Sequence, residues 1–188
     1  DRLCGVFHLI PVDVVMDSEI SFYALCALMF SVGLSVGNDP QTLKNFRSLN
    51  PRLVFLPVMT ILGTLAGSAA VSLILTHRSV TDCLAVGSGF GYYWLSSIFI
   101  TEYKGAELGT IALLANISRE ILTLLAAPLL VRWFGNLAPI SAGGATTMDT
   151  TLPIITRTAG QQFVVVSIFH GFVVDFSVPF LVTLFCSI

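Results

Sequence analysis

The feature that most restricts the fold of this chain is a series of long segments without any ionised side chain. Residues 20–38, 53–76 and 83–101 each contain at least 19 consecutive residues that carry no charge. A helix of about 20 apolar residues crosses the roughly 30 Å of hydrocarbon in a bilayer. Inside that hydrocarbon, a chain must satisfy its own backbone hydrogen bonds. Each of the three segments is therefore predicted to be a membrane-spanning helix.

The composition excludes several classes of protein. Of the 188 residues, 55% are hydrophobic and only 11% are charged, against roughly one quarter charged in a soluble domain. Nine basic and eleven acidic residues leave a net charge of -2, which is too little for a surface that binds nucleic acid. The four cysteines have no CxxC spacing and no neighbouring histidine, so we expect neither a metal site nor a cofactor.

Three further apolar segments complete the predicted fold. Residues 108–131 form a span with Arg119 and Glu120 in its middle, residues 138–155 are interrupted by glycines, an aspartate and a proline, and residues 161–185 form a last span. The sequence thus predicts an all-α integral membrane protein with about six hydrophobic segments. One or two of these are expected to be broken or re-entrant, as in secondary transporters.

The domain organisation follows from these segments. We expect one transmembrane domain over residues 1–188, in which 1–17 form an interfacial helix or a partial span and 18–188 form the membrane-spanning core. The loop 39–52 carries three basic residues and is predicted to face the cytoplasm, because basic loops stay on that side. Whether 138–155 crosses the bilayer or dips in and returns stays open, and the side of the C-terminus depends on it.

A polar stripe is predicted at the middle of the span 108–131. Asn116, Glu120 and Thr123 share one helix face by their spacing, and Arg119 lies one step around from Glu120. An ionised side chain at the bilayer centre costs about 2.5 to 3.5 kcal/mol on insertion scales, so such groups face protein or water and usually mark a functional site. The alternative is that both charges pair with neighbouring helices and only fix the packing.

Residues 143–153, with the sequence GGATTMDTTLP, disfavour a continuous helix. Backbone amides that such a break releases need partners in protein or in a water-filled cavity. A helix that restarts there points its positive end at a bound anion, so Thr146, Thr147 and Asp149 are candidate binding residues. The alternative is a plain surface loop, in which the threonines bond to their own backbone carbonyls.

Two other segments, residues 87–94 and the last span, each allow more than one interpretation. Residues 87–94, GSGFGYYW, form either a second helix break or a close-packing surface of small residues, and Tyr92 there lines a substrate path or belongs to an interfacial aromatic belt. In the last span, His170 is interpreted as a packing residue rather than a proton relay. Asp175 is expected either to pair with Arg119 or to bind a coupling cation.

The segments 116–120 (NISRE), 143–153 and 87–93 together resemble the bacterial LysO family of lysine exporters. The likeness is densest over residues 85–157. The family's usual single chain is longer and has additional N-terminal spans, and some members are split, with a short membrane protein supplying the missing part. The resemblance therefore implies such a partner, a homo-oligomer, or both.

The resemblance also implies a function. It implies the export of L-lysine and of toxic lysine analogues across the bacterial inner membrane, driven by proton exchange. It further implies that an acidic residue matching Glu120 is needed for transport. A second needed acidic residue would belong to the N-terminal half that is missing here.

The charges of lysine suggest how such a site would work. Burial in low dielectric requires compensating groups at both ends of the molecule. We expect Glu120 to hold an ammonium group, and the helix end near residues 145–148, helped by Arg119, to hold the carboxylate. Asn116 and Thr147 would fix the orientation. Because a proton and the ammonium group would compete for Glu120, the expected result is antiport.

Other classes of function stay open. Broken helices and intramembrane carboxylates also suit sodium-coupled transport of a small organic anion, with Asp149 or Asp175 binding Na⁺. A non-transporting subunit of a split transporter is a further alternative. An intramembrane hydrolase using Ser88 and His170 would need a nucleophile within reach of a base, which nothing in the spacing indicates, so we do not expect an enzyme.

Overall fold

The computed structural model describes residues 51–75 and 77–188, and every regular element within them is helical. This confirms the predicted all-α fold for the described part of the chain, whereas 1–17 and 20–38 lie outside it. The described elements belong to one unit, Ser48–Ile188. In order they are η1 (Pro51–Phe55), α5 (Leu56–Ile74), α6 (Val80–Gly87), α7 (Tyr93–Lys104), α8 (Ala106–Phe134), α9 (Ala138–Gly143), η2 (Gly144–Met148), α10 (Leu152–Ala159), η3 (Gln161–Phe163) and α11 (Val164–Ser187).

Three of the described segments are long and apolar enough to cross a membrane. They are Leu53–Ile74, Ala106–Phe134 and Gln161–Ser187, and they confirm the spans predicted at 53–76, 108–131 and 161–185. Large apolar side chains on these helices point away from the protein, such as Leu73 on α5 and Leu125 on α8, which are 80% and 75% exposed. Such surfaces suit contact with lipid.

The segment 83–101 is not a single span, so that prediction is wrong. Helix α6 ends at Gly87 and α7 begins at Tyr93. Between them Phe90 and Gly91 have positive φ angles of 46° and 94°, which turn the chain and end the helix. Of the two alternatives that the glycines left open, the helix break is present, and apolar composition alone did not reveal it.

The segment formed by α6 and α7 enters and leaves at the same end of the structure. Arg78, just before α6, forms an ion pair with Glu107 at the start of α8. Lys104 at the end of α7 lies 3.9 Å from Asp82 in the first turn of α6. These two pairs bring the start of α6, the end of α7 and the start of α8 together, so α6–α7 is a re-entrant hairpin.

A second re-entrant hairpin comes from the opposite end. Helices α9 and α10 each have a proline in the first turn, Pro139 and Pro153, where the missing N–H costs nothing. A buried cluster of Ile140, Ile155, Ala159 and Val166, with Val131 packed against it, joins the start of α9, the end of α10 and the adjoining parts of α8 and α11. Residues 138–155 therefore dip in and return.

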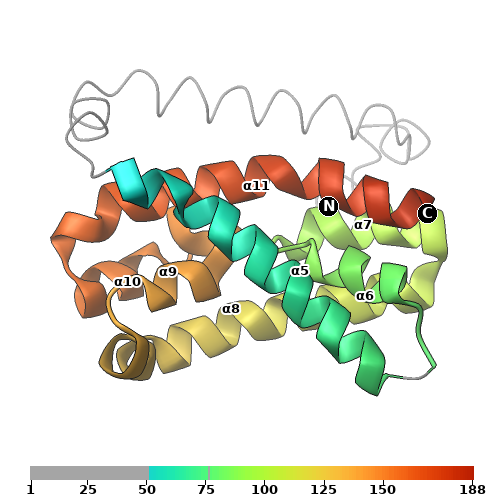
Figure 1. The fold of residues 1–188 in the computed structure, drawn as a ribbon, viewed down its shortest axis with the longest axis horizontal. Helices are drawn as coiled ribbons and strands as arrows, with labels where there is room; N and C mark the ends of the chain where they lie inside the picture. The colour runs from blue at the N-terminus through green and yellow to red at the C-terminus, as the bar shows by residue number, and fades with distance from the viewer. Residues whose placement is uncertain (1–50, 76) are drawn as a thin grey trace, which may run out of the picture. The chain divides into compact units, whose positions relative to one another are not determined.

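The hairpins meet in the middle of the unit. Figure 1 shows α8 and α11 running in opposite directions along its length, α5 crossing obliquely, α6–α7 at one end and α9–α10 at the other. A span followed by a hairpin thus occurs twice, as α5 with α6–α7 and as α8 with α9–α10, in opposite directions. This is the topology of inverted repeats in secondary transporters, which place their binding sites at the repeat interface near the bilayer midplane.

The charges of the two ends differ. The end that carries the α6–α7 hairpin has two basic and three acidic side chains: Arg78, Lys104, Asp82, Glu102 and Glu107. At the other end, the described residues provide Arg132 and Arg157 and no acidic side chain. Basic residues favour the cytoplasmic side. Arg52 in η1, next to Leu53 that packs on the cluster of α9 and α10, adds a third basic residue at this end against two at the other, so we infer that the α9–α10 end faces the cytoplasm.

This orientation can be tested by cysteine labelling. In a variant without the four native cysteines, Glu102→Cys should react with a membrane-impermeant maleimide in right-side-out vesicles. Arg157→Cys should react only in inside-out vesicles, because the exposed side chain lies at the other end. Labelling of both positions from the same side would contradict the paired re-entrant topology.

Candidate functional site

The tips of the two hairpins touch through their backbones. The N–H of Ala145 in η2 donates a hydrogen bond of 2.9 Å to the carbonyl oxygen of Phe90 in the other tip. A Cβ atom at Gly144 would overlap that same oxygen, and one at Gly91 would lie 3.1 Å from the carbonyl oxygen of Gly143. Both glycines have positive φ, 65° and 94°, so side chains are excluded here by both space and conformation.

Asn116 on α8 holds the tip of the first hairpin. Its side-chain oxygen accepts a 2.8 Å hydrogen bond from the N–H of Gly91, and its amide nitrogen donates to the carbonyls of Val86 at 3.2 Å and Ala112 at 2.9 Å. The side chain is only 3% exposed. Asn116 therefore satisfies backbone groups that the break between α6 and α7 releases.

Arg119, one turn further along α8, holds the second hairpin. Its Nε donates to the carbonyl oxygen of Ala142 at 2.7 Å, and Nη2 donates to that of Ser141 at 3.0 Å. Nη1 reaches Thr64 on α5 at 3.4 Å, and the guanidinium lies 5.8 Å from the centre of the Phe90 ring. The guanidinium thus binds carbonyl oxygens at the C-terminal end of α9, which carry partial negative charge.

Glu120 differs from its neighbour Arg119. It lies at the middle of α8 and is half-buried. Within the described part of the chain, neither it nor Asp175 has a hydrogen bond or ion pair. The two adjacent charges do not form a pair, because Arg119 turns towards α9 and α5. The packing alternative thus applies to Arg119, while Glu120 lacks a permanent counter-ion among the described residues.

The threonines of η2 hold the second tip together. Thr146 Oγ1 donates to the carbonyl oxygen of Gly143 at 3.0 Å, and Thr147 Oγ1 lies 2.8 Å from that of Gly144 and 2.9 Å from that of Ser167 on α11. Residues 143–147 are all buried. The surface-loop alternative is therefore wrong, although the threonines do bond to nearby carbonyls as that alternative assumed.

His170 on α11 is a buried, satisfied side chain. Nδ1 lies 3.2 Å from Thr147 Oγ1, and Nε2 lies 2.9 Å from Thr60 Oγ1 on α5. The single hydroxyl proton of Thr147 goes to a carbonyl, so its oxygen accepts from Nδ1–H, and Nε2 then accepts from the hydroxyl of Thr60. These contacts agree with the packing interpretation of His170.

Tyr92 before α7, Asp149 after η2 and Asp175 on α11 belong to segments that pack on one another, through Gly91 against Thr146 and Gly171 against Met148. Asp149, just after η2, is exposed, and its Oδ1 accepts a 2.6 Å hydrogen bond from the N–H of Thr150. Asp175 on α11 is buried. Since the ion pairs among the described residues include none between Asp175 and Arg119, the predicted pairing of these two is wrong.

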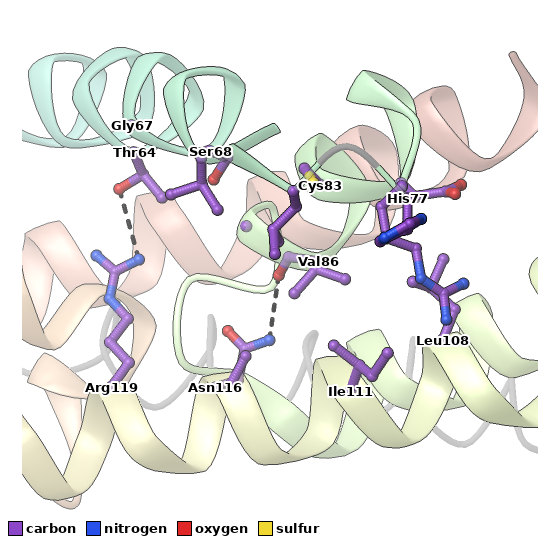
Figure 2. Close-up of a pocket in the computed structure, with 16 residues that line it drawn as sticks. Thr64, Gly67, Ser68, His77, Cys83, Val86, Leu108, Ile111, Asn116 and Arg119 are labelled. Atoms are coloured by element: carbon purple, nitrogen blue, oxygen red, sulfur yellow. Dashed lines mark hydrogen bonds between the residues drawn. The ribbon is translucent and has the colours of Figure 1, made fainter. Parts of the chain in front are cut away.

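A cavity of about 750 Å³ lies between α5, α6 and α8. Figure 2 shows Arg119, Asn116 and Thr64 at one side of it and His77 and Leu108 at the other. The cavity therefore connects the mid-depth region of α8 with the end where α6 starts. Its walls are mainly apolar, and Arg119 provides the positive charge nearest the hairpin tips.

Helix α5 contributes polar side chains to this region that were not among the predicted site residues. Thr60, Thr64 and Ser68 contact His170, Arg119 and Gly87, respectively. Their spacing of four residues places them on one face of an otherwise apolar helix, which is the signal that could have identified them. Because a Cβ atom at Gly87 would overlap Ser68, close packing accompanies the break in this segment.

The backbone contact between the tips predicts that Gly144→Ala is strongly destabilising. The methyl group would overlap the Phe90 carbonyl, and the positive φ angle adds strain, so we expect a loss of at least about 2 kcal/mol in stability. The melting temperature in detergent measures it. Gly63→Ala is the matched control, since nothing lies within 4 Å of its Cβ position, and it should be neutral or stabilising. Equal melting temperatures for the two variants would contradict the contact.

The contacts of Arg119 predict that Arg119→Lys lowers stability even in the absence of any substrate. Lysine keeps the charge but cannot bridge the carbonyls of Ser141 and Ala142 as a planar fork does. We expect a clear decrease in melting temperature, whereas Arg132→Lys, at an exposed position near the end of α8, should leave it unchanged. A wild-type melting temperature for Arg119→Lys would mean that the guanidinium does not hold the hairpin.

Comparison with known proteins agrees with this membrane architecture. The family model described as "Lysine exporter LysO" matches residues 2–186. The chain is 36% identical over 170 residues to "Lysine exporter LysO" of Escherichia coli (strain K12), which covers 90% of this chain and 56% of that protein. It is 35% identical over 167 residues to a "Putative lysine exporter" of Haemophilus influenzae (strain ATCC 51907 / DSM 11121 / KW20 / Rd), covering 89% of this chain and 84% of that protein.

The search of solved structures found no match. The chain spans just over half the length of its Escherichia coli relative. The family match covers nearly all of the chain, and the fold contains three helices able to cross a membrane. From these observations we conclude that the chain belongs to the LysO family of lysine exporters, a family of membrane transporters rather than enzymes.

Proposed function

We propose that this chain exports L-lysine and toxic lysine analogues across the bacterial inner membrane, in exchange for protons that bind at Glu120. The names of both relatives support lysine as the substrate. The observation that carries the mechanism is Glu120 itself. It is a carboxylate at the middle of a membrane-spanning helix, directly after Arg119, with no counter-ion among the described residues.

A carboxylate without a counter-ion at this depth favours two states in which its charge is neutralised. In one it carries a proton, and in the other it neutralises a bound ammonium group, because a bare ionised group is costly inside the bilayer. The proton and the substrate therefore exclude each other at Glu120. Exchange between these two states couples lysine export to proton import.

The other end of lysine needs a donor for its carboxylate. Arginine has five N–H groups, and three of those on Arg119 are directed at the protein. The remaining two, on Nη1 and Nη2, make no hydrogen bond to the described residues, and Arg119 lines the cavity. Arg119 thus serves both the fold and the substrate carboxylate in this proposal.

The other proposed site residues act in two ways. Asn116, Thr146 and Thr147 position the tips, because their polar atoms are bonded to backbone groups. Asp149, Asp175 and Tyr92 offer further polar groups beside the second tip.

The position of the cavity supports an outward-facing state. It runs from Arg119 towards the α6–α7 end, which faces the periplasm in the orientation inferred from the charges. In this state a proton would reach Glu120 as lysine leaves. The inverted arrangement of the two hairpins provides the corresponding path from the cytoplasmic end when one repeat moves against the other.

A partner chain is part of the proposal. A short membrane protein with further N-terminal spans, a second copy of the chain, or both would complete the transporter. In the alternative in which the chain is a non-transporting subunit, Glu120 would carry no coupling function. Sodium-coupled transport of an organic anion receives less support, because the names of both relatives point to lysine.

The proposal predicts that Glu120→Gln abolishes proton-coupled lysine efflux without loss of folding. Glutamine keeps the shape of the side chain but can neither ionise nor exchange a proton. The measurement is efflux of radiolabelled lysine, together with the accompanying change in internal pH, from cells that lack their own lysine exporters. Glu102→Gln, at an exposed position on α7, is the control and should behave as wild type. Lysine-driven proton movement at the wild-type rate in Glu120→Gln would refute the assignment.

A further inference from the structure

The tip of the second hairpin brings two aspartates together next to the first hairpin. Gly171 of α11 packs so closely on η2 that a Cβ atom there would lie 2.7 Å from the backbone nitrogen of Met148. Asp149 follows Met148 directly, and Asp175 lies one helical turn beyond Gly171 on the same face of α11. The packing therefore brings the two aspartates to the same part of the structure.

Tyr92 reaches this region from the first hairpin. It follows Gly91, whose Cβ position lies 3.4 Å from Thr146 in the second tip. Tyr92 before α7, Asp149 after η2 and Asp175 on α11 thus adjoin the packed tips, and we call these residues the Tyr92–Asp149–Asp175 cluster.

The buried member of this cluster lacks a partner. Asp175 is 6% exposed, and within residues 51–75 and 77–188 it makes no hydrogen bond or ion pair. A carboxylate buried in this way is usually paired or bound to a cation. Asp149 is exposed and uses Oδ1 for the N–H of Thr150, so its Oδ2 is available and the cluster is open on that side.

Basic side chains in the described part of the chain do not fill this role. Arg119 is directed at α9 and α5, and His170 is bonded at both ring nitrogens. Arg78 and Lys104 pair with carboxylates at one end of the structure, while Arg132 and Arg157 lie at the other. No basic side chain of the described residues therefore neutralises this cluster.

We propose that the Tyr92–Asp149–Asp175 cluster is a binding site for one positively charged group, either a substrate ammonium or a monovalent metal cation. Two carboxylates and a phenol suit such a group. The described residues contain no group of three or more His, Cys, Asp or Glu side chains of the kind that holds a transition metal. If the proposed function is correct, lysine supplies two ammonium groups, and Glu120 and this cluster each bind one.

Binding to the purified full-length chain in detergent tests the site. L-lysine, NaCl and KCl are each titrated at constant ionic strength with choline chloride, and binding is followed by calorimetry and by the melting temperature. Asp175→Asn should bind the cationic ligand at least tenfold more weakly than wild type. Without ligand it should be at least as heat-stable as wild type, because the amide removes an uncompensated charge. Asp175→Glu should recover part of the affinity.

The controls separate the possible ligands. Glu102→Gln changes an exposed carboxylate away from the cluster and should bind as wild type. A lysine response that is lost in Asp175→Asn identifies the ligand as an ammonium group, and a sodium or potassium response that is lost identifies it as a metal cation. Either result supports the site.

The result that would overturn the site is wild-type affinity for lysine, Na⁺ and K⁺ in both Asp175→Asn and Asp149→Asn, or no response of wild type to any of the three. A different result would contradict the proposed function. Efflux from Glu120→Gln would then stay proton-coupled, whatever the binding to Asp175→Asn shows.

Discussion

The structure depends on one backbone contact at mid-depth, the hydrogen bond from Ala145 N–H to the Phe90 carbonyl. A membrane interior offers no water to unpaired amides and carbonyls, so a broken helix is stable there only if protein groups replace the missing bonds. Here the tip of the second hairpin donates a backbone hydrogen bond to a carbonyl in the tip of the first. Two side chains of α8, Asn116 and Arg119, supply much of the remainder.

This arrangement separates structural charge from functional charge. Arg119 would be the most costly group in the middle of the membrane, but the carbonyls at the end of α9 balance it locally. Because the cation is balanced by backbone dipoles, no carboxylate is needed as its counter-ion. Glu120 and Asp175 are therefore left without a partner in the described part of the chain, which suits groups that bind and release protons or cations.

Much of the fold could be predicted from the sequence, because long apolar helices and glycine-rich breaks have direct physical signatures. The spans at 53–76, 108–131 and 161–185 and the interruption at 138–155 are confirmed. The segment 83–101 was predicted as a span, since hydropathy records composition but not the φ angles of Phe90 and Gly91. For the site, sequence could place Arg119 and Glu120 at mid-depth. It could not show that Arg119 turns to α9 while Asp175 remains unpaired, because these contacts join segments far apart in the chain.

The two hairpins also explain why a repeat of this kind is hard to recognise in sequence. Both repeats consist of a span and a hairpin, but the side chains that hold the two tips differ in kind. A neutral amide, Asn116, both accepts and donates at the first tip, where an N–H and a carbonyl need partners. A guanidinium that can only donate, Arg119, serves the second tip, where two carbonyls need partners. Both side chains come from the same helix, α8. The type of each side chain matches the backbone groups that lack partners at its tip, and the two tips share no sequence motif. A repeat conserved in backbone topology can thus be asymmetric in charge, and this asymmetry places a cation beside one hairpin only.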